Sequence, residues 1–318
     1  MTVNGQVQEM TFKGRDMIEL DDYTPDEIQY LLDSAIELKH KHKNGEVFQP
    51  LKGKTIGLIF EKSSTRTRVS FEAGMYQLGG HALFLSKNDI QLGRGEPISD
   101  TAQVMSRYLD GIMIRTFGHD NVINLARYAS IPVINGLSDM AHPCQVLADL
   151  QTILEHKGKL SGLKMAFIGD GNNMANSLLI GGAKMGMHVA VASPEGYEPD
   201  ERIVQLSREI ARETGAEITV THDPVAAAKD ADVIYTDVWA SMGFEEEQKQ
   251  REAAFADYQV NEELVKAAKP DYLFLHCLPA HRGEEVSEGV IDGENSVIFD
   301  QAENRLHAQK ALMVALMA

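Results

Sequence analysis

The strongest constraint on the fold is a series of short apolar segments, most of them followed by a loop and then by a helical pattern. A short apolar run between loops is typical of a strand buried on both faces. Strands that alternate with helices are typical of parallel sheets covered by helices. The expected strands cover residues 55–60, 81–85, 111–115, 132–135, 164–169, 188–192, 217–221, 232–237 and 272–277. The sequence therefore predicts a doubly wound α/β fold.

The expected strands form two groups. A long helical pattern over 142–162 separates them and ends in the polar stretch HKGKLSG. A chain of 318 residues has room for two domains of about 150 residues each. We expect domains at 1–150 and 151–300, each with a central parallel sheet flanked by helices. The amphipathic segment 301–318 has no strand after it, and we expect it to pack back on the first domain.

One helix start is clear from local sequence. Thr24 can cap a helix, Pro25 suits the first helical position, and Glu27 completes a capping box. Apolar residues then recur at helical spacing. The pattern predicts a helix that begins near residue 25 and buries one face.

The charge balance limits the kinds of partner. The chain has 47 acidic and 30 basic side chains and a net charge of −17. Such a chain repels phosphate backbones and anionic lipid, so we expect neither a nucleic acid nor a membrane as partner. No apolar run reaches the ~20 residues of a membrane helix, and the N-terminus lacks a secretory signal. With only two cysteines, we expect a cytoplasmic protein.

Polar motifs recur directly after the expected strands. Open parallel sheets bind ligands beyond the carboxyl ends of their strands. The loops at these positions read EKSSTRTRVSFE, SKNDIQLGRGE, GLSDMAHPCQ, DGNNMANS, VWASMG and LPAHRGEE. Since they belong to two sheets, we expect an active site in the cleft between two domains.

The segment SSTRTR at 63–68 opens one of the expected helices. A helix N-terminus carries free N–H groups and partial positive charge, which favours acidic residues. Arg66 and Arg68 stand there instead. A bound anion explains them, because hydroxyls, N–H groups and a guanidinium together suit a phosphate. The alternative is a Ser/Thr cap with two surface arginines. The glycines of a P-loop are absent.

Each of the other candidate residues has a structural and a functional interpretation. Arg115 ends a strand and either pairs with an acid or points into the cleft. His142 begins a helix, where histidine is more often structural than catalytic, and Gln145 lies on the same turn. Asp237 ends a strand and either holds a substrate ammonium or caps a helix. Cys277 is either a reactive or a buried structural thiol.

The sequence disfavours bound cofactors. GDGNNM at 169–174 resembles the start of a dinucleotide fingerprint, but Met174 replaces the third glycine. The next strand also lacks the acid that binds ribose. His142, Cys144, His276 and Cys277 lack the spacing of a structural zinc site. We therefore expect neither a nicotinamide cofactor nor a zinc ion at these residues.

Together these motifs resemble the aspartate/ornithine carbamoyltransferase family over essentially the whole chain. STRTR at 64–68 and HPxQ at 142–145 match its shared carbamoyl-phosphate half. Cys144, the motif DxxxSMG at 237–243 and HCLP at 276–279 indicate the ornithine branch. The resemblance implies transfer of the carbamoyl group of carbamoyl phosphate to the δ-amine of L-ornithine, giving L-citrulline and phosphate. It also implies a role in arginine metabolism and amino-acid biosynthesis, no metal or cofactor, and a homotrimer, with stacked trimers as an open alternative.

The resemblance assigns roles to individual residues. Carbamoyl phosphate is expected at Ser64, Thr65, Arg66, Thr67, Gln91, Arg115, His142, Gln145, Cys277, Leu278 and Arg305. Ornithine is expected at Asn173, Asp237, Ser241 and Met242. The expected catalytic residues are Arg115, His142, Asp237 and Cys277.

The family pattern also implies how the site works. Gln91 matches a residue that neighbouring subunits insert into each other's sites. Carbamoyl phosphate is expected to bind first, and the SMG loop at 241–243 to move as the domains close. We expect Cys277 to orient the amine without forming a covalent intermediate.

Two alternatives remain beside this activity. A sister carbamoyltransferase would use putrescine or an N-acylated ornithine, although Asp237 and the SMG loop suit the α-amino and carboxylate end of ornithine. A non-enzymatic anion-binding regulator on the same scaffold would not need Asp237, Ser241, Met242 and Cys277.

Overall fold

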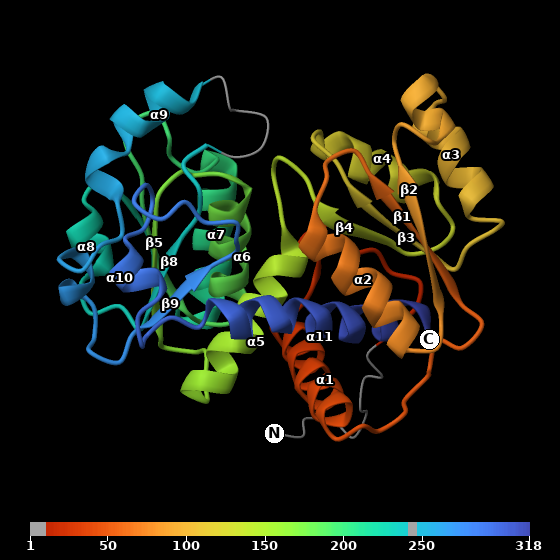
Figure 1. Cartoon of the computed structure of the whole chain (residues 1–318), viewed down its shortest axis with the longest axis horizontal. Coiled ribbons are helices and arrows are strands. Elements are labelled where there is room, and N and C mark those ends of the chain that lie inside the picture. The colour runs from red at the N-terminus through yellow and green to blue at the C-terminus, as the bar shows by residue number, and fades with distance from the viewer. Residues whose placement is uncertain (1–10, 241–246) are drawn as a thin grey trace.

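The structure is a computed structural model that describes residues 11–240 and 247–318, and it contains two parallel sheets side by side (Figure 1). The first sheet has the strand order β2-β1-β3-β4, and the second has the order β7-β6-β5-β8-β9. The strands are β1 (Thr55–Phe60), β2 (His81–Ser86), β3 (Gly111–Arg115), β4 (Val133–Leu137), β5 (Lys164–Ile168), β6 (His188–Ala192), β7 (Ile218–Thr221), β8 (Val233–Thr236) and β9 (Leu273–His276). The predicted pair of parallel sheets is confirmed.

Helices flank both sheets, as the alternating pattern predicted. They are α1 (Pro25–Lys43), α2 (Thr65–Gln77), α3 (Ile98–Met105), α4 (His119–Tyr128), α5 (Pro143–Lys157), α6 (Asn173–Lys184), α7 (Glu201–Thr214), α8 (Pro224–Ala228), α9 (Gln248–Ala254), α10 (Glu288–Ile291) and α11 (Ile298–Met317). No helix in these described ranges is both long and apolar enough to cross a membrane.

The expectation that every strand is buried on both faces is wrong for two of the four edge strands, β2 and β7. The exposed fractions of Leu83 and Phe84 in β2 are 39% and 36%. β7 is likewise only partly buried. The other two edge strands, β4 and β9, stay buried, and each is bridged by a residue outside the named strands, Met17 and Ser296 respectively. The inner strands β1, β3, β5, β6 and β8 are almost completely buried.

The predicted start of α1 is confirmed by its hydrogen bonds. The Glu27 backbone N–H donates to Thr24 Oγ1 over 3.2 Å, and the Thr24 N–H donates to Glu27 Oε2 over 2.9 Å. These two bonds form a capping box, with Pro25 as the first helical residue.

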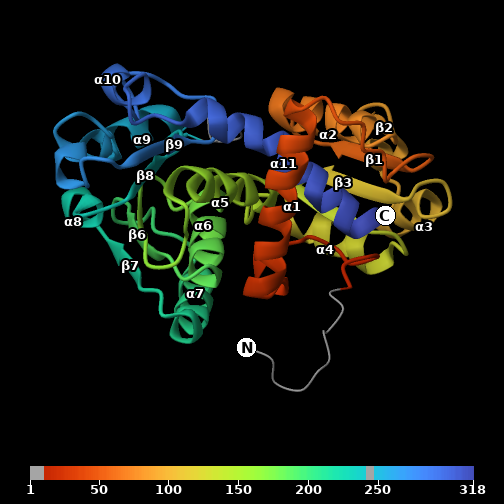
Figure 2. The ribbon, with the colours of Figure 1, turned by 90° about the horizontal axis from the view of Figure 1, so that it is seen from below.

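Two helices join the halves of the molecule. α5 leads from β4 of the first sheet to β5 of the second, and most of its residues are buried. α11 contacts β9 of the second sheet and then α1, α2 and α5 (Figures 1 and 2). One apolar core includes Phe71 and Leu58 from the first half with Phe167 and Tyr235 from the second. The two sheets are therefore held against a shared helical base.

Candidate active site

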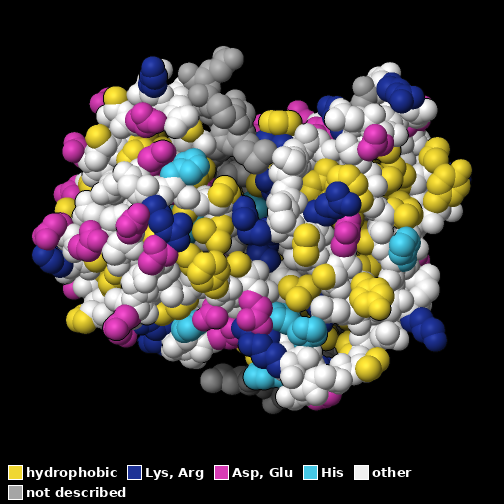
Figure 3. All heavy atoms as spheres, viewed as in Figure 1, with side chains coloured by type: hydrophobic (Ala, Val, Ile, Leu, Met, Phe, Trp, Pro, Cys, Tyr) yellow, Lys and Arg dark blue, Asp and Glu magenta, His cyan; other side chains and the backbone are white. Residues whose placement is uncertain are grey.

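A cavity of about 310 Å³ lies between the two halves, at the carboxyl ends of their strands. The space-filling view shows Lys and Arg side chains gathered in this hollow (Figure 3). The residues that sequence analysis assigned and that line the cavity are Ser64, Thr65, Arg66, Thr67, Arg115, His142, Gln145, Asn173, Asp237, Cys277, Leu278 and Arg305. Segments more than two hundred residues apart in sequence therefore meet at one place.

The N-terminus of α2 forms one wall. Ser64 is the N-cap, and its hydroxyl accepts a hydrogen bond from the Thr67 N–H over 3.2 Å. Arg66 lines the cavity, whereas Arg68 turns away, pairs with Glu72 over 2.9 Å and stacks on an exposed ring of β2. Only one of the two arginines that the motif places here therefore faces the anion site.

The last helix brings a second guanidinium to the same wall. Arg305 donates to Gln145 Oε1 over 2.7 Å, to Thr67 Oγ1 over 3.1 Å and to Gln309 Oε1 over 3.0 Å. It is almost completely buried, although it lines the cavity. These bonds tie α11 to α2 and α5 at the site.

Burial lowers the pKa of both Arg115 and His142, but it leaves Arg115 charged and His142 neutral. Burial, together with Arg305 and Arg66 nearby, lowers the pKa of Arg115 to about 10, so it stays charged at neutral pH. Burial and the same cationic surroundings hold the pKa of His142 well below its usual range, so its imidazole is neutral. Arg115 Nε and His142 Nδ1 are buried and have no hydrogen-bond partner among the described residues.

The cavity is cationic although the chain is acidic. Among the described residues, its lining contains Lys62, Arg66, Arg115 and Arg305 but only one carboxylate, that of Asp237. Within residues 11–240 and 247–318, the three guanidiniums form no ion pair. Their charges are therefore available to an anionic ligand.

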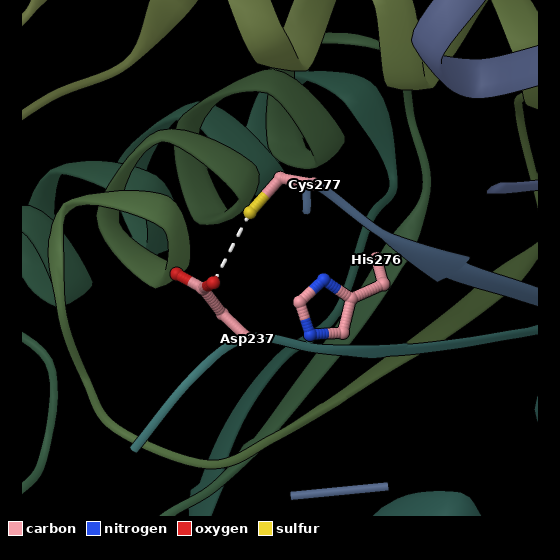
Figure 4. A group of neighbouring side chains, drawn as sticks. All are labelled: Asp237, His276 and Cys277. Atoms are coloured by element: carbon pink, nitrogen blue, oxygen red, sulfur yellow. Dashed lines mark hydrogen bonds between the residues drawn. The ribbon is translucent and has the colours of Figure 1, made fainter. Parts of the chain in front are cut away.

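The opposite wall comes from the second sheet. Asp237 follows β8, and its Oδ1 accepts hydrogen bonds from Cys277 Sγ over 3.1 Å and from the Val238 N–H over 2.8 Å (Figure 4). Its Oδ2 accepts from Asn172 Nδ2 over 3.0 Å. Burial and the Asp237 charge raise the pKa of the Cys277 thiol well above its usual range. Cys277 is therefore a thiol that donates to a carboxylate, not a thiolate nucleophile.

His276 supports this wall without lining the cavity. Its Nδ1 accepts from the Leu278 N–H over 2.9 Å, so the ring proton is on Nε2. Nε2 donates to the buried carboxylate of Glu285 over 3.0 Å. The ring thus fixes the backbone between Cys277 and Leu278.

Potential metal ligands also meet at this wall. Donor atoms of Asp237, His276 and Cys277 lie within 4.8 Å of one another. Both ring nitrogens of His276 are already hydrogen bonded, and the Cys277 thiol holds its proton. A metal would need a deprotonated thiolate and a free imidazole nitrogen, so these residues do not fit a metal ion as they stand. Cys144 lies elsewhere and donates to the Asn135 carbonyl over 3.4 Å.

Three assigned residues lie outside the cavity or outside the described part of the chain. Gln91 is exposed on a short 3₁₀ helix, Gln91–Arg94, and does not line the cavity of its own chain. Ser241 and Met242 lie outside the described residues. Asn173 lines the cavity, and its side chain donates to the Ser138 carbonyl over 2.7 Å.

Several residues that line the cavity were not predicted from the sequence. They are Lys62, Ser63, Leu137, Met174, Val238 and Pro279. Lys62 follows β1 by two residues, so the rule on strand carboxyl ends could have identified it. The buried Asp149 beneath the cavity was also missed. Its spacing of four from Gln145 on one helix was the available indication.

Comparison with known proteins gives consistent matches over both halves. Residues 15–155 match the family model described as aspartate/ornithine carbamoyltransferase, carbamoyl-P binding domain, and residues 161–316 match the Asp/Orn binding domain of that description. A protein of Oceanobacillus iheyensis named ornithine carbamoyltransferase is 64% identical over 321 residues, covering 100% of both chains. A namesake from Anoxybacillus flavithermus is 65% identical, covering 96% of this chain and 97% of its own.

A solved structure is similar over almost the whole chain. It is the ornithine carbamoyltransferase from Pyrococcus furiosus, with a TM-score of 0.94 and 57% sequence identity. The match covers 97% of this chain and 98% of that one.

Proposed function

The chain belongs to the aspartate/ornithine carbamoyltransferase family, and we propose that it acts as an ornithine carbamoyltransferase. The carbamoyl group of carbamoyl phosphate passes to the δ-amine of L-ornithine, giving L-citrulline and phosphate. One observation carries the proposal: a cavity with four cationic side chains on one side faces Asp237 and Cys277 on the other.

The cationic side suits the phosphate of carbamoyl phosphate. The first turn of α2 offers backbone N–H groups and the side chains of Ser64, Thr65 and Thr67. Arg66 and Arg305 supply charge beside them. A helix N-terminus with adjacent guanidiniums binds a phosphate through charge-assisted hydrogen bonds. This wall therefore holds the leaving group in place and neutralises it.

The carbamoyl group lies next to Arg115, His142 and Gln145 in this arrangement. Attack on its carbon places negative charge on the carbonyl oxygen. Arg115 is charged and His142 is a neutral imidazole, so both can donate a hydrogen bond without giving up a proton. Each preorganised donor of this kind lowers the barrier by about 3–4 kcal/mol.

The second wall orients the amine. Asp237 and Cys277 lie where the ornithine would face the carbamoyl carbon, and Asn173 lies beside them. Asn173, Asp237, Ser241 and Met242 are the residues that we propose bind ornithine. The amine must be neutral to attack, after which the new C–N bond forms, the C–O bond to phosphate breaks and the nitrogen gives a proton to the departing phosphate. Because Cys277 is a protonated thiol, its role is to orient the amine.

We extend the proposal to the setting of the reaction. The enzyme works in the cytoplasm, in arginine metabolism, and binds carbamoyl phosphate first because the first half supplies most of the cavity. It is a homotrimer in which Gln91 of one subunit completes the site of the next. Its exposed position away from its own cavity supports that arrangement.

A parallel-substrate assay tests the substrate. Purified protein is incubated with carbamoyl phosphate and, separately, ornithine, putrescine, N-acetylornithine or aspartate, and the ureido product is measured by colour. We expect turnover with ornithine alone. Good turnover with another amine and little with ornithine would overturn the substrate, and no turnover with any amine would favour an anion-binding regulator.

A further inference from the structure

A buried carboxylate lies one side chain behind the phosphate-binding wall. Asp149 is on α5, four residues after Gln145, is completely buried and does not line the cavity. Its Oδ1 accepts from Gln145 Nε2 over 2.8 Å and from Gln301 Nε2 over 2.7 Å, and its Oδ2 accepts from Tyr235 OH over 3.1 Å. Three donors from α5, α11 and β8 therefore converge on one group.

These bonds fix the direction of the Gln145 amide. Asp149 Oδ1 accepts from two amide nitrogens and so has no proton to donate, which means that the Gln145 amide nitrogen must face it. A guanidinium can only donate, so the amide oxygen must face Arg305. The structure has both contacts, at 2.8 Å and 2.7 Å. Reversing the amide would place donor against donor on one side and acceptor against acceptor on the other.

Within the part of the chain that the structure describes, Arg305 is held by neutral acceptors only. Its three nitrogens donate to Gln145, Gln309 and Thr67. Gln309 is itself oriented, because its Nε2 donates to Ser70 Oγ over 2.7 Å. A carboxylate in direct contact would neutralise the guanidinium in this buried place. The amides hold Arg305 in position and leave its positive charge to an incoming anion.

The same carboxylate reaches the ornithine half. Gln301, which donates to Asp149, accepts from the His276 N–H over 2.9 Å. Tyr235, the third donor, is in β8 two residues before Asp237. Asp149 thus anchors Gln145 and, through Tyr235 and Gln301, also helps to place the carboxyl ends of β8 and β9.

We propose that Asp149 and Gln309 are positioning residues for phosphate recognition. Gln145 and Gln309 hold Arg305 without neutralising it, and Asp149 sets the direction of the Gln145 amide. The inference rests on the proposed function, because it concerns how the carbamoyl-phosphate half recognises its dianion. Neither positioning residue lines the cavity.

The first test places a carboxylate against Arg305 from outside the cavity. Gln309→Glu keeps the shape of the side chain and its acceptors but adds a charge, and Gln309→Met keeps the size without the charge. Inorganic phosphate binding is measured by calorimetry, with KM for each substrate and kcat by assay. We expect Gln309→Glu to weaken phosphate binding and raise the KM for carbamoyl phosphate roughly tenfold, with the ornithine KM little changed.

Gln309→Met is the matched control. It loses the hydrogen bond but leaves Arg305 charged, so we expect a smaller loss of phosphate affinity than in Gln309→Glu. Unchanged phosphate affinity in Gln309→Glu overturns the inference. An equal loss in both variants also overturns it, because it would assign Gln309 a packing role. Thermal unfolding confirms that each variant is folded.

The second test asks whether Asp149 acts through Gln145. Asp149→Asn and Gln145→Ala are compared singly and together. We expect Asp149→Asn to weaken phosphate binding in the wild-type background and to add little in the Gln145→Ala background. Additive losses contradict the inference.

The measurement of inorganic phosphate binding tests this inference independently of the proposed reaction. If the wild-type protein binds phosphate but does not turn over ornithine, the reaction is wrong and the variants still test the role of Arg305. If the wild-type protein binds no phosphate, the inference itself fails.

Discussion

Single residues in the cavity differ in how burial affects their charge. Arg115 loses some basicity but remains a cation, whereas burial among arginines keeps His142 neutral. A protonated histidine would add a further positive charge to a site that already has four cationic side chains. The neutral ring instead offers one N–H donor, which suits an uncharged carbonyl oxygen.

Removing one cavity arginine should abolish most of the activity. We expect Arg66→Ala and Arg115→Ala each to lower kcat/KM by roughly 10²–10³-fold, because each removes a charged donor to the reacting group. Steady-state kinetics measures the loss. The subunit assembly, measured by light scattering, should be unchanged.

Arg68→Ala is the matched control for these variants. Arg68 stands in the same motif but pairs with Glu72 on the surface. We expect nearly normal kcat/KM in this variant. Normal activity in either cavity variant, or equal loss in all three, would contradict the assigned roles.

Glu19 should make the stability of the fold depend on pH. Burial raises the pKa of Glu19 to about 7, against about 4.3 in an unfolded chain. Between these values the folded state holds a proton that the unfolded state has lost. The stabilising contribution is therefore complete below about pH 4 and is lost as the pH rises through 7.

Glu19→Gln removes this dependence because an amide does not ionise. From about pH 5 to pH 8, we expect its free energy of unfolding to fall less than that of the wild-type protein, by up to about 3 kcal/mol. Urea unfolding at several pH values measures it. Asp149, whose pKa is also raised to about 7, is present in both proteins and cancels in the comparison. Parallel curves for the two proteins would show that Glu19 does not titrate in this way.

The regular elements could be predicted from local sequence, and the edges of the sheets could not. Each expected strand is present because apolar runs of four to six residues between polar loops suit an inner parallel strand. Leu83 and Phe84 are exposed on the edge strand β2, whereas Met17 and Ser296 bridge the edge strands β4 and β9, which stay buried. Local sequence contains neither the strand order nor these bridges.

In the candidate site, too, some residues could be predicted from local sequence and others could not. Residues that follow strands, such as Arg115 and Asp237, were identified because the carboxyl ends of parallel strands share one edge. Arg305 was assigned through the family resemblance alone, since nothing local shows that its helix returns to α2 and α5. Asp149 and Gln309 were missed because a buried polar residue on a helix face looks like any other polar position until its partners are known.

The capping box of α1 contributes stability at the level of one element. Thr24→Ala removes the acceptor for the Glu27 N–H, and we expect the protein to lose about 1 kcal/mol of unfolding free energy. Chemical denaturation measures the change. Thr24 is far from the cavity lining, so kcat should be unaffected.

Thr24→Ser is the control, because serine retains the hydroxyl. We expect it to keep most of the stability. A loss as large as that of Thr24→Ala would attribute the effect to packing instead of the cap.

The proposal that neighbouring subunits share a site leads to a prediction for the assembled molecule. Gln91→Ala and Arg115→Ala should each be nearly inactive alone, because every site lacks one group. When the two variants are unfolded, mixed equally and refolded, some sites combine Arg115 of one subunit with Gln91 of its neighbour. Random assembly should restore about a quarter of the wild-type sites.

Activity of the mixed protein measures this complementation. Each variant refolded alone is the control and should stay inactive. A mixture that remains inactive would show that Gln91 does not reach into a neighbouring site.

Because α11 is the last helix of the chain and supplies part of the cavity, the cavity can be completed only after the whole chain has been synthesised. Arg305 joins Gln145 and Thr67, which precede it by 160 and 238 residues. During synthesis, the groups that we propose bind the phosphate emerge from the ribosome long before the Arg305 guanidinium that contacts them. The first sheet and its helices must therefore wait, with an apolar face uncovered, until translation has delivered the second half and the helix after it. A nascent chain cannot hold carbamoyl phosphate as the finished protein does.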